Sequence, residues 1–269
     1  MPDHVKQHTL PKFYIALFGD STEKPSKNSN VWYYPLDEPL PRKWRRERAQ
    51  DISVRGDYYS LLNSPPEKRL VVEKFFADVE SAAAPALKSL ALGQDLKVGS
   101  LSLFVATMMA RPPVLIEGFA AFASRLSGRP DTSYPDRARN KPRLIESLGV
   151  NLRAMVEDVE PRLRRMTWNV FITTDEEPPF ISSDCPVATT LPINGSREED
   201  LDHPGCEISM PLTKRAAVLI AQPGSGPRGM IHACKPGAVH AMNVRTVTRA
   251  SSFLIAPSPT FPGVEELVR

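Results

Sequence analysis

Proline limits the length of any regular element in this chain. The sequence holds 27 prolines in 269 residues, twice the usual share of about 5%. Each proline fixes φ and removes a backbone hydrogen-bond donor, so it interrupts helices and sheets. The excess argues against a plain helical bundle and against a long regular sheet. It predicts short elements joined by stiff loops.

Residues 64–165 carry apolar side chains at helical spacing. Ser64 is a suitable N-cap, with Pro65 at the first helical position and Glu67 three residues after the cap. We expect the helix that follows to end near Pro85, and residues 86–93 are compatible with another turn or two before Gly93. Its apolar stripe comprises Val72, Phe75, Phe76, Val79 and Ala83. Further helices are predicted over residues 101–109, 114–126 and 144–159.

The two ends of the chain are rich in the β-branched and aromatic residues that favour strands. Periodicity leaves the apolar segment at 8–20 open as a short helix or a strand. Two strands joined by an acidic turn are predicted over 168–174 and 180–187. Other strands are predicted over 31–34, 207–212, 216–221 and 253–256, and a helix that carries Asn243 over 239–252.

These elements predict an α+β fold. A central helical region, about residues 64–165, should pack against a mixed or antiparallel sheet built from the N-terminal segment and the C-terminal third. We expect a single domain over 1–269, with a β-rich N-terminal segment at 1–63 and a β-rich C-terminal region at 166–269.

The composition indicates an ordinary globular protein of a reducing compartment. Hydrophobic residues make up 41% of the chain and charged residues 24%. The cysteines, Cys185, Cys206 and Cys234, are odd in number and scattered, which predicts neither a disulfide framework nor a zinc site. The N-terminus lacks a signal-peptide pattern, and no apolar run approaches ~18 residues. We expect a cytoplasmic protein without a membrane partner.

One basic run bears on possible nucleic-acid partners. The net charge of +3 is too small to imply nucleic acid by itself. The run is either a solvated face or a patch that contacts phosphate groups, and it comprises Arg42, Lys43, Arg45, Arg46 and Arg48.

Short blocks along nearly the whole chain share one order and spacing. The earlier blocks are His8–Tyr14, Val31–Tyr34, Tyr58-Tyr59, the pair Glu73 and Glu80, and Arg111-Pro112-Pro113. The later blocks are Phe180–Val187, Pro211-Leu212 and Asn243. Together they resemble the bacterial "domain of unknown function" family 4238. Cys185 stands where the family pattern has asparagine. No activity is attached to this family, so the resemblance implies a fold and the positions of a site, and no reaction.

Glu73 and Glu80 are candidate metal ligands or acid–base groups. Glu80 lies seven positions after Glu73, which on a helix places both carboxylates on one face, about 10 Å apart along the axis. They border the apolar stripe. They either form a solvated flank, paired with nearby basic residues, or line a cleft.

Arg111 and Asp184 are the other charged candidates. Arg111 ends an apolar helix, where a cation offsets the helix dipole, or where it pairs with a carboxylate or an anionic ligand. Asp184 closes an apolar strand and either caps a turn or projects into a site. His8 is a candidate proton carrier, and Ser183 and Asn243 are candidate binding residues.

Two functions remain open. The first is a metal-assisted hydrolase of a phosphodiester or another phosphate-bearing substrate, including nucleic acid. In it Glu73, Glu80 and Asp184 hold Mg²⁺ or Mn²⁺, His8 moves a proton and Arg111 binds a phosphate oxygen. The second is a non-catalytic binding or regulatory protein, in which the same residues form a structural network. Arg111 bonded directly to both glutamates would favour the network, and an open pocket between them would favour a ligand.

Overall fold

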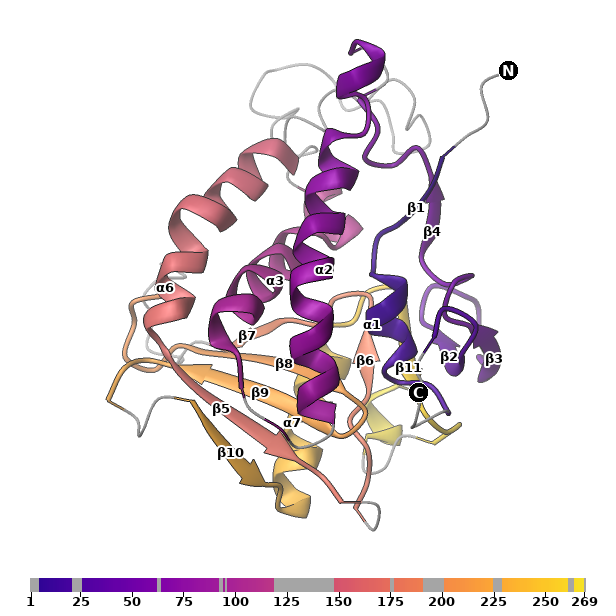
Figure 1. Cartoon of the computed structure of the whole chain (residues 1–269). Coiled ribbons are helices and arrows are strands. Elements are labelled where there is room, and N and C mark those ends of the chain that lie inside the picture. Colours follow the sequence, from indigo (N-terminus) through magenta and orange to yellow (C-terminus); the bar gives the residue numbers. More distant parts are fainter. Residues whose placement is uncertain are drawn as a thin grey trace.

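The computed structural model describes residues 5–20, 26–61, 64–91, 94, 96–118, 148–174, 177–190, 201–224, 229–260 and 264–268. Within them the chain has the predicted α+β fold, with helices packed against strands from both ends of the chain (Figure 1). No helix among these residues combines the length and the hydropathy needed to cross a bilayer.

The larger sheet comes from the C-terminal third. Its strands, counted over the described residues, have the order β10-β5-β9-β8-β7. β10 pairs with β5 in parallel and the other pairs are antiparallel, so the sheet is mixed. In that order the strands are Met230–Ala233, Thr167–Ile172, Ala216–Ala221, Glu207–Thr213 and Ala188–Thr190.

The two ends of the chain meet in a second sheet, which is antiparallel, with the order β3-β2-β11-β6. N-terminal β2 therefore lies directly beside C-terminal β11. The strands are Arg45–Arg48, Asn30–Pro35, Phe253–Ala256 and Ser182–Ser183. A separate antiparallel pair joins β1 (Lys6–His8) to β4 (Val54–Gly56).

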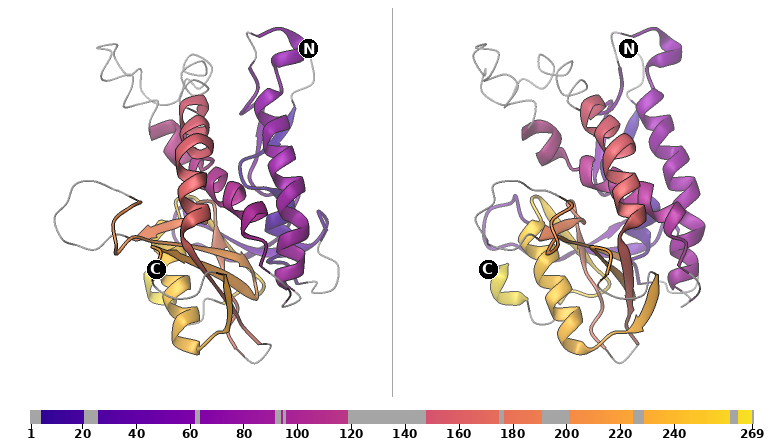
Figure 2. Two further views of the ribbon diagram at one scale, coloured as in Figure 1. Left: turned by 60° about the vertical axis from the view of Figure 1, so that its left-hand side comes forward. Right: turned by 90° about the vertical axis from the view of Figure 1, so that its left-hand side faces the viewer.

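Helices cover both faces of the larger sheet (Figure 2). One side carries α2 (Val71–Ala91), α3 (Val98–Ala110) and α6 (Glu160–Arg165), and the other carries α7 (Pro236–Arg249). Side chains alternate between the faces of a strand. Val218 and Ile220 of β9 accordingly join the core beneath α2 and α3, whereas Ala217 packs against α7.

Short helical segments complete the fold. The segment that periodicity left open forms a helix, α1 (Lys12–Ala16). Two 3₁₀ turns, η1 and η3, span Pro66–Lys68 and Glu265–Leu267. The predicted helices over 114–126 and 144–159 are helical at 113–118 and from 148 onwards, and their remaining residues lie outside the described part of the chain.

The first long helix differs from its prediction at both ends. Pro85 lies inside α2, which continues to Ala91, so the predicted end near Pro85 is wrong. Ala86, Leu87 and Leu90 are at most 1% exposed, and their burial offsets the cost of an internal proline, about 3 kcal/mol. At the other end, the segment after Ser64 forms only η1. The α-helix itself begins at Val71.

The hairpin predicted over 168–187 is also wrong. β5 lies in the larger sheet beside β9 and β10, whereas β6 pairs with β11 in the other sheet. Pro178 and Pro179 lie between the two strands and cannot donate to a ladder. The chain therefore crosses from one sheet to the other at this point. β10 was not predicted, because it is a short edge strand with little alternation.

Candidate functional site

Arg111 joins three separate segments of the chain. It follows α3 at the C-cap position and is only 3% exposed. Its Nη1 donates to Oε1 of Glu80 on α2 at 2.6 Å, and its Nη2 donates to the main-chain oxygen of His8 on β1 at 2.7 Å. The buried guanidinium therefore ties the N-terminal strand to two helices.

Aromatic rings enclose this guanidinium. Its central carbon lies 4.2 Å from the ring centre of Phe76 and 5.7 Å from that of Tyr59. The hydroxyl of Tyr59 donates to the main-chain oxygen of Arg111 at 3.4 Å, and burial raises the pKa of Tyr59 to about 12. Ring faces attract cations, more strongly where water is excluded. The rings therefore support a buried charge that would otherwise be costly.

Arg111 bonds one of the two predicted glutamates. Oε2 of Glu73 is buried without a hydrogen-bond partner among the described residues, and so is Nε of Arg111. Burial raises the pKa of Glu73, while Arg111 acts in the opposite direction. A structural network was expected to have Arg111 bonded directly to both glutamates. Arg111 bonds Glu80 and does not bond Glu73.

His8 belongs to the same cluster, because its main-chain oxygen binds Arg111 and its imidazole lies near Arg111 and Glu80. Burial lowers the pKa of its imidazole, and both Arg111 and Glu80 are close enough to act on it. Its Nε2 donates to the main-chain oxygen of Gln50 at 3.0 Å. The structure therefore brings together His8, Glu73, Glu80 and Arg111.

Glu73 gives a prediction of pH-dependent stability. Burial raises the pKa of the Glu73 carboxyl in the folded protein. At pH values just above the ordinary carboxyl pKa, the folded protein therefore still holds a proton that the unfolded chain has already lost. Stability should fall as pH rises through that window. Glu73→Gln is expected to remove this fall and to be more stable than the natural chain near neutral pH. Urea unfolding at a series of pH values measures it.

The control for that prediction is Glu67→Gln, which changes an exposed glutamate of η1. It should shift the curve of stability against pH far less. Parallel pH curves for Glu73→Gln and the natural chain would contradict the expectation.

Asp184 lies in a different part of the fold. Its carboxylate accepts hydrogen bonds from the amides of Ser251 and Ser252 at 3.0 and 3.1 Å, and a longer one from Phe253 at 3.5 Å. The amides of Ser251 and Ser252 belong to the turn between α7 and β11, and Phe253 begins β11. Asp184 is 6% exposed. It holds this turn against β6.

Ser183 and Asn243 also bond to the backbone near α7. The Ser183 hydroxyl accepts from the amide of Cys185 at 3.1 Å. The Asn243 side chain accepts from the amide of Ile181 and donates to the main-chain oxygen of Pro179, both at 3.1 Å. It fixes α7 to the segment that leads into β6.

The predicted metal ligands do not form one group. Among the described residues, no three histidine, cysteine, aspartate or glutamate side chains converge as a metal ion requires. Asp184 is bound to the turn after α7, whereas Glu73 and Glu80 lie on α2 beside Arg111.

The basic run is largely neutralised. Arg45 pairs with Glu38, Arg46 with Asp20, and Arg48 with Asp51. These arginines lie on β3, the edge strand of the second sheet. Pairing with carboxylates reduces the positive field that phosphate groups would meet.

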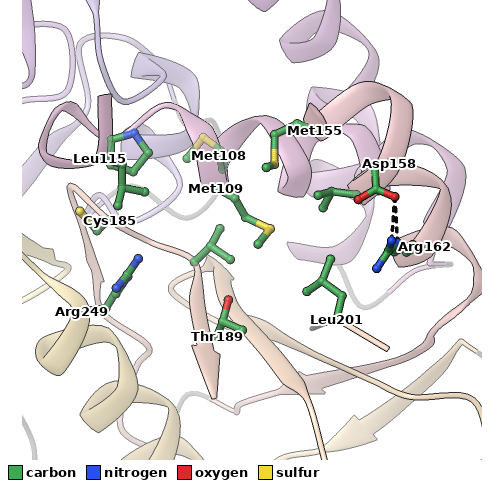
Figure 3. Close-up of a pocket in the computed structure, with 13 residues that line it drawn as sticks. Met108, Met109, Leu115, Met155, Asp158, Arg162, Cys185, Thr189, Leu201 and Arg249 are labelled. Carbon is green, nitrogen blue, oxygen red and sulfur yellow. Dashed lines mark hydrogen bonds and ion pairs between the residues drawn. The ribbon is translucent and has the colours of Figure 1, made fainter. Parts of the chain in front are cut away.

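A cavity of about 570 Å³ lies between the helical layer and β7, and its lining includes Pro112 but not Arg111 (Figure 3). Its apolar lining includes Met108 and Met109 of α3, Met155, Val187 and Leu201. Met155 begins a π-helical turn, η2 (Met155–Val159), and Asp158 and Val159 of the same turn also line the cavity. π-turns inside helices are frequent at functional sites.

The cavity has one neutralised and one unneutralised arginine. Arg162 forms ion pairs with Asp158 at 2.9 Å and Asp202 at 3.2 Å. Arg249, the last residue of α7, lies across the cavity beside Cys185 and Thr189 (Figure 3). No carboxylate of the described residues forms an ion pair with Arg249.

Sequence reasoning missed this cavity. Its methionines were assigned to apolar helix faces, and nothing in their spacing distinguishes a cavity wall from a packed core. The opposite wall comes from separate segments of the chain that carry Cys185, Val187, Thr189, Leu201 and Arg249. The irregular turn at Met155–Val159 has no sequence signature that we can identify.

Comparison with known proteins gives one match. A family model described as "Protein of unknown function (DUF4238)" matches residues 6–260. No curated protein and no solved structure matches the chain. Because the family model spans most of the sequence, including the positions of His8, Arg111 and Asp184, the chain belongs to the DUF4238 family of proteins of unknown function.

Proposed function

We propose that this chain is a non-catalytic binding protein whose ligand occupies the cavity between α3, η2 and β7. The observation that carries this proposal is that the cavity and the predicted catalytic residues occupy different parts of the structure. The cavity lining is mostly apolar and contains none of the residues predicted to be catalytic. All of those residues except Glu73 are instead engaged in hydrogen bonds between distant segments of the chain.

The bonds of these residues support a structural role. Arg111 connects β1, α2 and α3, and Asp184 connects β6 to the turn before β11. Asn243 connects α7 to the segment before β6. A group that must bind substrate needs free donors or acceptors, whereas most of these are already used. This pattern favours the network hypothesis over catalysis.

The cavity has the properties of a small-molecule site. Such sites usually have volumes of about 300–1,000 Å³ and an apolar lining with a few polar groups. The cavity, at about 570 Å³, falls in this range. Methionine side chains adapt to ligands of different shape because they are flexible and polarizable. Met108, Met109 and Met155 therefore suit a ligand with an apolar body.

Narrowing the cavity should weaken ligand binding. Met109→Trp is expected to weaken binding of the neutral fluorescent probe N-phenylnaphthylamine by about tenfold or more, or ~1.4 kcal/mol, because the indole occupies space that the probe needs. Leu103→Trp is the matched control, since Leu103 is also half-buried on α3 but does not line the cavity. A fluorescence titration measures both dissociation constants. Equal binding by the two variants, or no binding to the natural chain, would overturn the proposal.

The metal-assisted hydrolase remains a second candidate because of one observation. Glu73 keeps a buried oxygen without a described partner, and both Arg111 and Glu80, two turns along α2, lie close enough to act on its pKa. Under this function, Arg111 and Asp184 serve a ligand, and their removal should leave the free energy of unfolding unchanged or higher. Under the binding function, their removal should lower it strongly.

A further inference from the structure

Arg249 differs from the other charged residues of the cavity. It is the last residue of α7 and reaches the cavity beside Cys185, on the side opposite Arg162 (Figure 3). Arg162 is already paired with Asp158 and Asp202. Arg249 therefore supplies the positive charge that the described lining leaves without an ion pair.

Asp184, the carboxylate beside Cys185, forms no ion pair with Arg249 among the described residues. Asp184 directly precedes Cys185, and the charges of both Asp184 and Arg249 affect the pKa of the Cys185 thiol. Both oxygens of Asp184, however, accept hydrogen bonds from the amides of Ser251 and Ser252. An arginine beside an apolar cavity, with no hydrogen bond to another described residue, is suited to a carboxylate or phosphate, which it can bind through two parallel hydrogen bonds.

We propose that the ligand of this cavity is an amphiphile with a single anionic end, which Arg249 binds, and an apolar body that lies against Met109 and Met155. This inference rests on the proposed binding function and adds the class and the orientation of the ligand. The paired Arg162 and Asp158 border the other end of the cavity, where they offer no net charge to a second anion. A medium-chain carboxylate is the simplest ligand of this class.

Three probes of equal chain length test the charge of the ligand: decanoate, decanol and decylamine. Each competes with N-phenylnaphthylamine bound to the natural chain. We expect decanoate to bind at least fivefold more tightly than decanol and decylamine to bind most weakly. Since the guanidinium is partly exposed, the advantage of decanoate should shrink as salt is added.

Two arginine variants test the position of the anionic end. Arg249→Met should reduce the affinity for decanoate about fivefold and leave that for decanol unchanged, as expected for the loss of one partly exposed charged contact. Arg165→Met is the matched control, because Arg165 also ends a helix, is exposed and lies outside the cavity. It should change neither affinity.

The outcomes separate the two proposals. If decanol and decanoate bind equally, or if Arg249→Met affects them equally, the anionic ligand is wrong and the apolar binding site remains. If the neutral probe itself does not bind, or binds as well to Met109→Trp, the binding function fails, whatever the competitors do.

Discussion

Arg111→Met is expected to lower the free energy of unfolding by about 3–5 kcal/mol, the usual cost of removing one partner from a buried ion pair. The substitution leaves the Glu80 carboxylate, 23% exposed, without the cation that it contacts at 2.6 Å. It also leaves the main-chain oxygen of His8 without the donor at 2.7 Å. Methionine keeps the apolar contact with Phe76, so the loss reports on the charge. Urea unfolding followed by circular dichroism measures it.

Two further variants test whether this loss comes from the buried ion pair between Arg111 and Glu80. Arg111→Met combined with Glu80→Gln should cost less than the sum of the two single changes, because no uncompensated carboxylate remains. Arg153→Met removes an exposed arginine that pairs with Glu157 at 2.8 Å and should leave the urea midpoint almost unchanged, because solvent screens exposed ion pairs. If Arg111→Met is as mild as Arg153→Met, the structural network is wrong and the hydrolase gains support.

Sequence periodicity could predict the elements whose environment is local. The apolar stripes of α2 and α3 and the β-branched runs of β5, β8 and β9 follow from side chains that must face one core. The ends of elements were harder, because they depend on tertiary packing. Pro85 should have ended α2, yet Leu87 and Leu90 beyond it are fully buried and keep the helix intact. Proline spacing carries no information about that burial.

The pairing of strands was predictable only in part. That the two ends of the chain meet is confirmed by β2 and β11, whose neighbouring positions in the second sheet join residues more than two hundred positions apart. The crossing from β5 to β6 was not predictable, since two adjacent apolar runs with an acidic turn equally suit a hairpin. The segment between β5 and β6 is held by hydrogen bonds from the amides of Thr173 and Phe180 to the main-chain oxygens of Arg215 and Lys214. These two acceptors lie in the turn between β8 and β9.

The candidate residues were easier to find than their roles. His8, Glu73, Glu80 and Arg111 lie in one cluster, whereas Asp184, which the first hypothesis also included, binds the turn after α7. A sequence shows neither which atom accepts which hydrogen bond nor how much water remains. Buried charged groups are necessary for catalysis and for rigid networks alike. The cavity was missed for the opposite reason, since its methionines resemble ordinary core residues.

The second large loss of stability is expected when the hydrogen bonds between Asp184 and the turn that joins α7 to β11 are removed. Asp184→Ala is expected to lower the free energy of unfolding by about 3 kcal/mol, because hydrogen bonds to a charged acceptor contribute about 1.5–3 kcal/mol each and are not additive. The amides of Ser251 and Ser252 lose their acceptors at 3.0 and 3.1 Å. Urea unfolding measures the loss, and hydrogen exchange of these amides should become faster.

Asp184→Asn separates the charge of this group from its geometry. The amide keeps one acceptor oxygen, so the variant should lose about half as much stability as Asp184→Ala. Because the turn begins directly after Arg249, Asp184→Ala should also weaken decanoate binding, whereas binding of the neutral probe should change little. If Asp184→Ala unfolds at the same urea concentration as the natural chain, the carboxylate does not hold the turn. The strand-end aspartate would then be free for the catalytic role that the alternative function requires.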